Sequence, residues 1–340
     1  MGVTWDQLFT DELQAWLLES DPVNPGVRYF TLIDLLGIPA DSSEAQAARS
    51  DLMHLGPVPV ILAAQHPEGY WVKPGYYPKY TGTYWTLGLL ALLGADGTHP
   101  QVRKACNYVL DNERCSYGGF SMDGPSGLIH CLQGNLVNAL ILLGWLGDPR
   151  LDEAIGWLAR SISGDGIAPA EEKQAPVRYH RSGNCAPGFA CSANIFEPCA
   201  WGAVKAVLGL ARIPLGARTP AVQKAVDIGV DFLLSADPAT AEYPSPYTNK
   251  PNRSWFQFGM PIGYVTDVLQ NLEALTLAGY ARDPRLENGL GLVLSKRDEH
   301  NRWKMEYTYN GKTWVDVEVK GQLSKWVTLR ALRVLKAALA

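Results

Sequence analysis

The sequence predicts an all-α protein in which pairs of helices form a double-layered ring, an α/α toroid, around a central cavity. Three observations predict it: a helix start that recurs along the chain, an alternation of charge-poor and amphipathic helices, and a turn that recurs at helix ends. Period-two strand patterns are almost lacking. We expect a single domain over residues 1–340, in which residues 1–60 pack on the ring or complete it.

The recurring helix start is a polar residue or His, followed by Pro and then by an apolar-periodic run. It occurs at Asn24-Pro25, His99-Pro100, Asp148-Pro149, Thr219-Pro220 and Asp283-Pro284. A polar N-cap side chain accepts from an unpaired amide of the first turn, and Pro at the first helical position gives up an N–H that would have no partner there. The five pairs therefore predict the N-termini of repeats of unequal length.

Charge-poor and amphipathic helices alternate along the chain. Runs rich in Leu, Ala and Val occupy 86–93, 136–144, 203–211, 265–278 and 326–339, whereas the helices after most of the Pro residues are amphipathic. A charge-poor helix is buried on every side, and an amphipathic helix has one wet face, so the pattern predicts an inner and an outer layer. Short extended pieces are expected only near Tyr307 and over 315–319. An open solenoid stays an alternative, as does a HEAT-like helix over 24–37 outside the ring.

A related turn ends several of the outer helices. It reads Gln-His-Pro-Glu-Gly-Tyr-Trp over 65–71, and decayed copies follow at 116–120, 163–167 and 296–303. Gly permits the positive-φ turn that ends a helix. The turn resembles the Gln-x-x-x-Gly-x-Trp repeat of the terpenoid cyclase and protein prenyltransferase superfamily, the squalene-cyclase-like α-toroids. The resemblance covers most of the chain from about Ile61 onward, and it implies the toroid fold and an isoprenoid-like substrate.

The catalytic motifs of those families are missing from this sequence. It has neither the Asp-x-Asp-Asp motif of class II terpenoid cyclases nor the Asp-Asp-x-x-Asp motif of class I enzymes, and the zinc motif of the prenyltransferases is not recognisable. The catalytic residues of those families therefore cannot be assigned to positions of this chain, and fold alone does not imply function.

Composition excludes several classes of partner. The chain carries a net charge of −4 with no basic block, which argues against nucleic acid as a partner. It has no apolar run long enough for a transmembrane helix, and its first residues lack the basic stretch of a signal peptide. We therefore expect a cytoplasmic protein. Six cysteines are too few for a disulfide scaffold in such a chain.

Four of the cysteines predict a zinc site, formed by Cys131, Cys185, Cys191 and Cys199. Cys131 and Cys199 precede successive inner helices in nearly the same register, so parallel inner helices would bring them to one rim. The long loop between these helices would deliver the other two thiols, and four thiolates suit tetrahedral zinc. His180 or His130 would replace one sulfur if the geometry requires it. The alternative is that these cysteines are small buried apolar residues.

Aromatic residues at the starts of the inner helices predict the lining of the central cavity. The predicted substrate-binding residues are Tyr84, Trp85, Trp201, Trp255, Tyr264 and Trp326. Aromatic faces suit an apolar ligand and stabilise a carbocation through their ring quadrupoles. The alternative is that the rings fill the centre of the toroid as core.

Three carboxylates are acid–base candidates. Asp316 and Glu318 would share one face of an extended segment, and Asp267 stands at the start of a charge-poor helix. Burial of one member would raise its pKa and make it a general acid. The alternative is a solvated segment and a helix-start acid that interacts with the helix dipole.

Three functional hypotheses follow. The first is an enzyme or binding protein for an apolar, isoprenoid-like small molecule in the central cavity. The second is a non-catalytic binding or scaffold protein on the same fold, and the third is a lyase that acts on carbohydrate.

Overall fold

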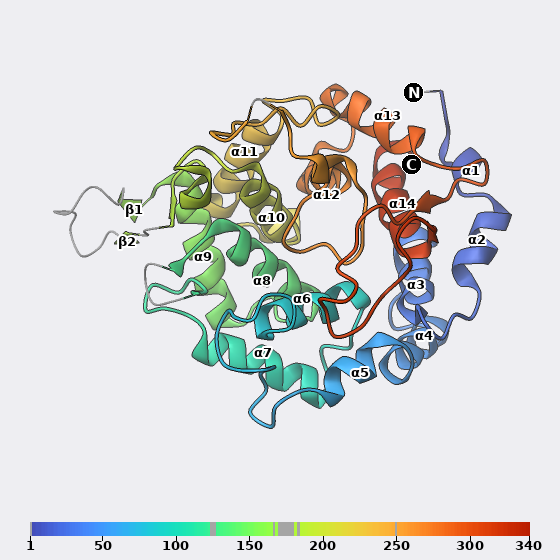
Figure 1. Cartoon of the computed structure of the whole chain (residues 1–340), viewed down its shortest axis with the longest axis horizontal. Helices are drawn as coiled ribbons and strands as arrows, with labels where there is room; N and C mark the ends of the chain where they lie inside the picture. Colours follow the sequence, from blue (N-terminus) through green and yellow to red (C-terminus); the bar gives the residue numbers. More distant parts are fainter. Residues whose placement is uncertain (1, 123–126, 166, 169–179, 182–183, 249) are drawn as a thin grey trace.

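The computed structural model describes residues 2–122, 127–165, 167–168, 180–181, 184–248 and 250–340. Its helices form two concentric layers around a common centre (Figure 1). The inner layer consists of α3 (Pro25–Phe30), α6 (Thr83–Leu93), α8 (His130–Leu142), α10 (Ala200–Ala211), α12 (Val268–Leu275) and α14 (Lys325–Leu339). The π-helical turns η1 (Thr31–Leu35) and η6 (Thr276–Tyr280) extend α3 and α12.

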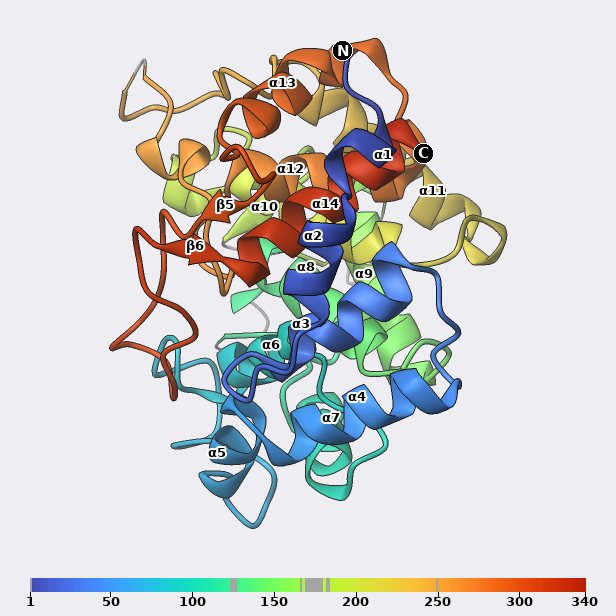
Figure 2. The same ribbon diagram turned by 90° about the vertical axis from the view of Figure 1, so that its right-hand side faces the viewer.

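The outer helices each pack against an inner partner or bridge two of them. They are α2 (Asp11–Leu18), α4 (Ser43–His54), α5 (Pro57–Ala63), α7 (Pro100–Asn112), α9 (Pro149–Ser163), α11 (Pro220–Leu233) and α13 (Glu287–Ser295). A short α1 (Trp5–Leu8) packs on α14, so the two ends of the chain lie close together (Figure 2). The predicted all-α, double-layered toroid is confirmed. Among the residues described, no helix combines the length and the apolar character that crossing a bilayer requires.

Helix α3 closes the inner ring, because it lies between α14, the last inner helix, and α6. Helix α14 packs on α3 and η1 (Figure 1). A Cβ on Gly26 of α3 would lie 2.4 Å from the carbonyl oxygen of Leu93 in α6 and 2.8 Å from the Trp326 ring in α14. Only glycine permits this approach. The open solenoid and the outer HEAT-like helix, which the sequence left open, are therefore wrong, and Pro25 begins an inner helix instead.

The inner helices run parallel, as the contact between α8 and α10 shows. A Cβ on Gly134 of α8 would lie 2.3 Å from the main-chain carbonyl of Lys205 in α10. Four residues further along α8, Asn138 accepts a hydrogen bond at 3.0 Å from Arg212, which lies seven residues after Lys205 at the end of α10. Residue numbers therefore rise together along the two helices. The parallel arrangement brings the N-termini of α8 and α10 to one rim of the toroid and their C-termini to the other.

The predicted repeats are visible as recurring hydrogen bonds. The indole N–H of Trp71 donates to the carbonyl of Ile61 at 2.8 Å, and that of Trp303 donates to Val293 at 2.7 Å, each acceptor lying ten residues earlier in the chain. Gln65 Nε2 donates to the carbonyl of Gln101 at the start of the next outer helix, at 2.9 Å. The turn that ends an outer helix thus binds the N-terminus of the next outer helix.

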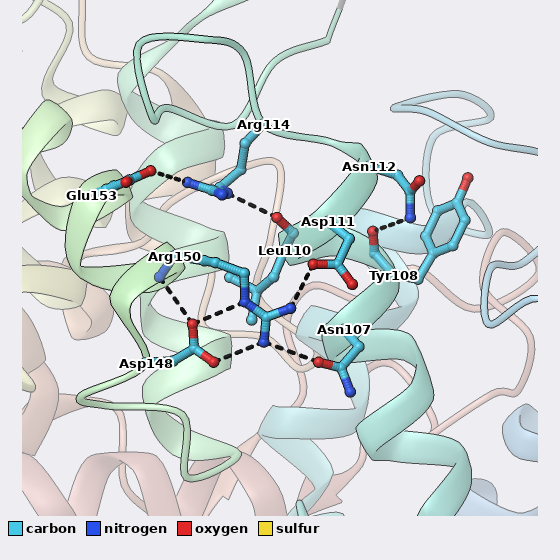
Figure 3. A network of polar contacts seen from close by, with 9 residues as sticks. All are labelled: Asn107, Tyr108, Leu110, Asp111, Asn112, Arg114, Asp148, Arg150 and Glu153. Atoms are coloured by element: carbon cyan, nitrogen blue, oxygen red, sulfur yellow. Dashed lines mark hydrogen bonds and ion pairs between the residues drawn. The ribbon is translucent and has the colours of Figure 1, made fainter.

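All five predicted Pro positions begin a helical segment. Asp148 accepts from the Arg150 main chain and side chain, and Asp283 makes the same contacts to Arg285. Arg150 also reaches the neighbouring outer helix α7, where its guanidinium donates to Asp111 at 2.6 Å (Figure 3). The Asn24 and His99 side chains make no such cap.

The described strands are three pairs of two residues each. They are β1 (Ile167–Ala168) with β2 (His180–Arg181), β3 (Cys185–Ala186) with β4 (Ala190–Cys191), and β5 (Trp303–Lys304) with β6 (Leu323–Ser324). Tyr307 forms one isolated bridge with Gly259. The segment 315–319, expected to be extended, is a loop without a strand, because its polar groups bond within the loop, as when Asp316 accepts from the amide of Gly311.

Candidate functional site

A cavity of about 240 Å³ occupies the centre of the ring. A cavity needs only roughly 10–15 Å³ to admit one water, so this space is large enough for a small molecule. Residues of every inner helix line it. Because the inner helices are parallel, their N-terminal ends define one end of the cavity and their C-terminal ends the other.

The end near the helix N-termini is aromatic. The Trp85 ring lies 5.5 Å from the rings of Tyr76 and Tyr80 and 6.2 Å from that of Tyr264, between ring centroids. Tyr80 in turn lies 4.9 Å from Tyr309. These rings come from the segment before α6, from α6 itself, from the loop before α12 and from the loop before α14. Together they form a wall with the geometry that aromatic pairs prefer.

Four of the six predicted substrate-binding residues lie on the cavity wall: Tyr84, Trp85, Tyr264 and Trp326. The Tyr84 hydroxyl donates to the carbonyl of Ser121 at 2.8 Å, so this end of the side chain is held by the protein. The remaining two lie elsewhere. The Trp201 ring is 6.1 Å from that of Tyr264, behind the wall, and Trp255 is buried against Tyr243.

The end near the helix C-termini is charged. Arg212 pairs with Glu273 at 2.7 Å, and Arg333 pairs with Asp34 at 2.5 Å. Arg49 approaches from α4 and pairs with Asp96 at 3.3 Å. Helix C-termini carry partial negative charge, which arginine at this rim offsets. The cavity is thus apolar at one end and polar at the other.

Three residues of the wall have a buried polar atom without a hydrogen-bond partner in the described part of the chain. The atoms are Nε of Arg49, Nε1 of Trp85 and Oε1 of Gln270. Leaving a buried donor or acceptor unsatisfied costs about 1–3 kcal/mol. Such atoms in native proteins are usually satisfied by water or by a ligand. Each of these atoms is covered by protein and has almost no accessible surface.

Gly88 marks the point on α6 where the wall is open. It lines the cavity, and a Cβ placed on it would meet nothing within 4 Å. Glycine in a helix interior is destabilising by about 0.5–1 kcal/mol relative to Ala, so no local requirement of the helix accounts for it. A larger side chain here would extend into the cavity.

The three predicted acid–base residues are not among the described residues that line the cavity. Asp267 is fully buried and caps α12 by accepting from the amide of Gln270 at 2.7 Å. Glu318 accepts from the amide of Lys325 at 2.8 Å, at the start of α14, and burial raises the pKa of its carboxyl. Asp316 is exposed. Two of the three therefore act as acceptors at the N-termini of inner helices, and their catalytic role stays an untested prediction.

The predicted thiols are partly brought together. The Cys191 thiol hydrogen-bonds to Cys199, and Cys131 lies close enough to both to influence their charge. Cys185 is the direct cross-strand neighbour of Cys191 and is buried. Within the described residues, no group of three or more His, Cys, Asp or Glu side chains is arranged to hold a metal ion. The zinc site stays a prediction from the sequence.

Several residues of these sites could not be identified from the sequence. Lys205 beside the thiols, Gln270 on the cavity wall and Gly88 all lie within inner helices, and their types carry no motif. A lysine in the charge-poor run 203–211 was the one available signal, since a charge there must be buried.

No family model and no curated protein matches the sequence. Its structure is similar to that of the type II terpene cyclase MstE from Scytonema, with 14% identity over 83% of this chain and 96% of that one, at a TM-score of 0.34. A variant of the same cyclase in complex with geranylgeranyl dihydroxybenzoate gives 15% identity, 83% and 95% coverage and a TM-score of 0.36. A likeness at this level says nothing about the chemistry of the cavity.

Proposed function

We propose that the protein binds an elongated, apolar small molecule of isoprenoid type in the central cavity, with a polar end such as a hydroxyl. The observation that supports this proposal is a central cavity whose wall is aromatic at one end and carries ion-paired side chains at the other. An apolar body would pack on the rings, and one hydroxyl both donates and accepts.

Binding is proposed ahead of chemistry because the acids on the cavity wall already have partners. Glu273 and Asp34 each accept from an arginine. Conversion of the ligand is therefore an outcome for the same experiment to detect, and it is not part of the proposal.

The test is ligand binding by the whole chain, followed by native mass spectrometry and by thermal shift. The probes are farnesol, geranylgeraniol, their diphosphates and the matching hydrocarbons. At a ligand concentration one hundred times Kd, binding stabilises the fold by about 2.7 kcal/mol. Extraction and gas chromatography of the same samples would reveal any conversion. A polyuronate oligosaccharide is included to test the lyase hypothesis.

Gly88 supplies the matched variants. Gly88→Leu should fill the cavity and abolish the shift, whereas Gly88→Ala should bind as the unmodified protein does. If no isoprenoid binds, or if Gly88→Leu binds as well as Gly88→Ala, the proposal is wrong, and the scaffold hypothesis is favoured.

A further inference from the structure

A long loop, 305–322, joins β5 to β6 and lies over the aromatic end of the cavity. The pairing of β5 with β6 closes its base, where the amide of Gly321 donates to the carbonyl of Met305 at 2.7 Å. From there the loop reaches the segment before α6 (Figure 2). Two of its residues, Tyr309 and Thr313, line the cavity. Loops longer than about 12–15 residues without regular secondary structure are uncommon in compact domains and are usually functional.

On one side, the loop is fixed to the segment that precedes α12. Tyr307 forms a bridge with Gly259, and a Cβ on Gly259 would lie 2.3 Å from the carbonyl oxygen of Tyr307, so the two main chains are in close contact. The Tyr309 hydroxyl accepts from the amides of Tyr264 and Val265 at 3.1 and 2.9 Å. The Tyr309 ring is 3% exposed. Its position in the cavity wall is therefore set by contacts at the far end of the side chain.

On the other side, Trp314 fixes the loop to the start of α6. Its indole N–H donates to the carbonyl of Thr81 at 3.1 Å and to Oγ1 of Thr86 at 3.0 Å. The partners of the loop thus belong to two different inner helices and to the segments before them. Because the loop is held at both sides, the part between its anchors forms a defined end of the cavity.

Thr313 is the position at which this end can vary most easily. Its hydroxyl hydrogen-bonds within the loop, to the carbonyl of Val315 at 2.9 Å and to that of Tyr309 at 3.4 Å. The contacts that fix the loop to the ring come from its neighbours, Tyr309 and Trp314. A different side chain at Thr313 would therefore change the cavity and leave the anchors of the loop in place.

The two ends of the cavity differ in a way that orients a ligand with one polar end. The opposite end holds the ion pairs of Arg212 with Glu273 and of Arg333 with Asp34. Covering such charged groups with an apolar chain removes water from them without replacing its hydrogen bonds. The polar end of a ligand therefore belongs at the charged end, and its apolar tail extends along the rings toward Tyr309 and Thr313.

We propose that Tyr309 and Thr313 determine the length of the apolar tail that the cavity accepts, and that Trp314 is the positioning residue that holds them there. This inference rests on the proposed function, because it assigns a length limit to the same ligand. A tail that ends short of the loop leaves space unfilled, whereas a longer tail meets the loop. One methylene in a hydrophobic pocket changes binding by about tenfold or more, so a limit set by two side chains is enough to select among isoprenoids.

The first experiment measures a series of alcohols that differ by one isoprene unit: geraniol, farnesol, geranylgeraniol and geranylfarnesol. Dissociation constants come from titration of the tryptophan fluorescence of the whole chain. Thr313→Trp should move the preference to a shorter alcohol and weaken the alcohol that the parent prefers by about tenfold or more. Thr313→Ala should move the preference to a longer alcohol. Both variants lose the hydroxyl, so shifts in opposite directions report the size of the side chain.

The control lies on the same loop. Val319→Trp adds a large ring at a position that is 66% exposed, and it should keep the order of the parent. Each variant is compared only if its melting curve matches the parent's, and Thr313→Ala decides alone if Thr313→Trp does not fold. If the parent binds the alcohols and both Thr313 variants keep its order, the inference is wrong and the proposed function stands. If the parent binds none of them, the proposed function is wrong and the inference falls with it.

The second experiment tests Trp314 and needs no ligand for its first measurement. Trp314→Phe keeps a ring and removes the N–H that Thr81 and Thr86 share. Hydrogen exchange of the amides in 307–316 should become about tenfold faster, while that of α8 and α10 stays unchanged. The preference between the best alcohol and the next should fall by about threefold or more, because one lost hydrogen bond allows the loop to move. Unchanged exchange, or an equal loss of affinity for every alcohol, would show that Trp314 does not position the loop.

Discussion

Arg330 and Asp267 form a bidentate ion pair inside the ring, with Nη1 2.9 Å from Oδ2 and Nη2 3.0 Å from Oδ1. Arg330 lies on α14 and Asp267 caps α12, so the pair joins two inner helices. Arg330 also donates to the carbonyl of Gly259 at 2.7 Å. Both side chains are buried, and each is satisfied mainly by the other.

We predict that breaking this pair destabilises the fold strongly. Asp267→Asn should lower the free energy of unfolding by about 3–5 kcal/mol, because it leaves a buried guanidinium without its counter-charge. The measurement is urea denaturation. Arg150→Ala, which removes a partly exposed ion pair with Asp111 (Figure 3), is the control and should cost less than about 1 kcal/mol. An equal effect of the two variants would contradict the prediction.

A second prediction concerns the contact between α8 and α10. Gly134→Ala should destabilise the protein by about 1–3 kcal/mol, since the new methyl group would lie 2.3 Å from the Lys205 main chain and would force the helices apart. Gly88→Ala is the matched control, a Gly to Ala change in a neighbouring inner helix with open space around it. It should stabilise the protein by about 0.5–1 kcal/mol. Opposite signs in urea denaturation are expected, and two changes of the same sign would refute the packing argument.

The repeat hydrogen bond of Trp303 gives a third prediction. Trp303→Phe removes the indole N–H and leaves the carbonyl of Val293 without this donor, so it should cost about 1–3 kcal/mol in addition to the lost packing. Trp71→Phe should behave alike, because its bond to Ile61 has the same geometry. Trp5, which is partly exposed and stacks on Phe9, is the control. If Trp5→Phe lowered the free energy of unfolding as much as Trp303→Phe does, the hydrogen bond would be unimportant.

A fourth prediction concerns acid. Burial lowers the pKa of His130 to about 4, and its Nε2 has no partner in the described part of the chain. The unfolded chain, where His has a pKa of about 6.5, therefore binds more protons than the folded chain between pH 6.5 and 4. Stability is fully present above pH 6.5 and is lost as the pH falls through this window.

The size of this effect follows from the shift. His130 alone should cost the protein about 2 kcal/mol on going from pH 7 to pH 5. Urea titrations at the two pH values measure it, with His130→Gln as the comparison, whose stability should fall by about 2 kcal/mol less over the same range. His66, an exposed histidine, provides the control variant His66→Gln, which should keep the full pH dependence.

Much of the fold could be predicted because its signals are local. The pair Asp148-Pro149 begins a helix through contacts within three residues, and these contacts recur at Asp283. Part of the aromatic wall could also be predicted from the sequence. Trp85 and Tyr264 lie at or just before the starts of inner helices, and parallel helices bring such positions together. The prediction of an extended segment over 315–319 was wrong, because polar contacts without a sequence period hold this loop.

What the sequence by itself determined, then, is the layering of the helices, because caps, turns and amphipathic faces depend on neighbours a few residues away. Only the tertiary structure decided the roles of the charged residues. The sequence suggests Asp267 as a candidate acid, whereas in the fold it forms a buried ion pair with Arg330, which lies far along the chain. Arg212 and Glu273, which are far apart in the sequence, likewise form an ion pair only in the folded ring, since the compensation of charge depends on distance in space.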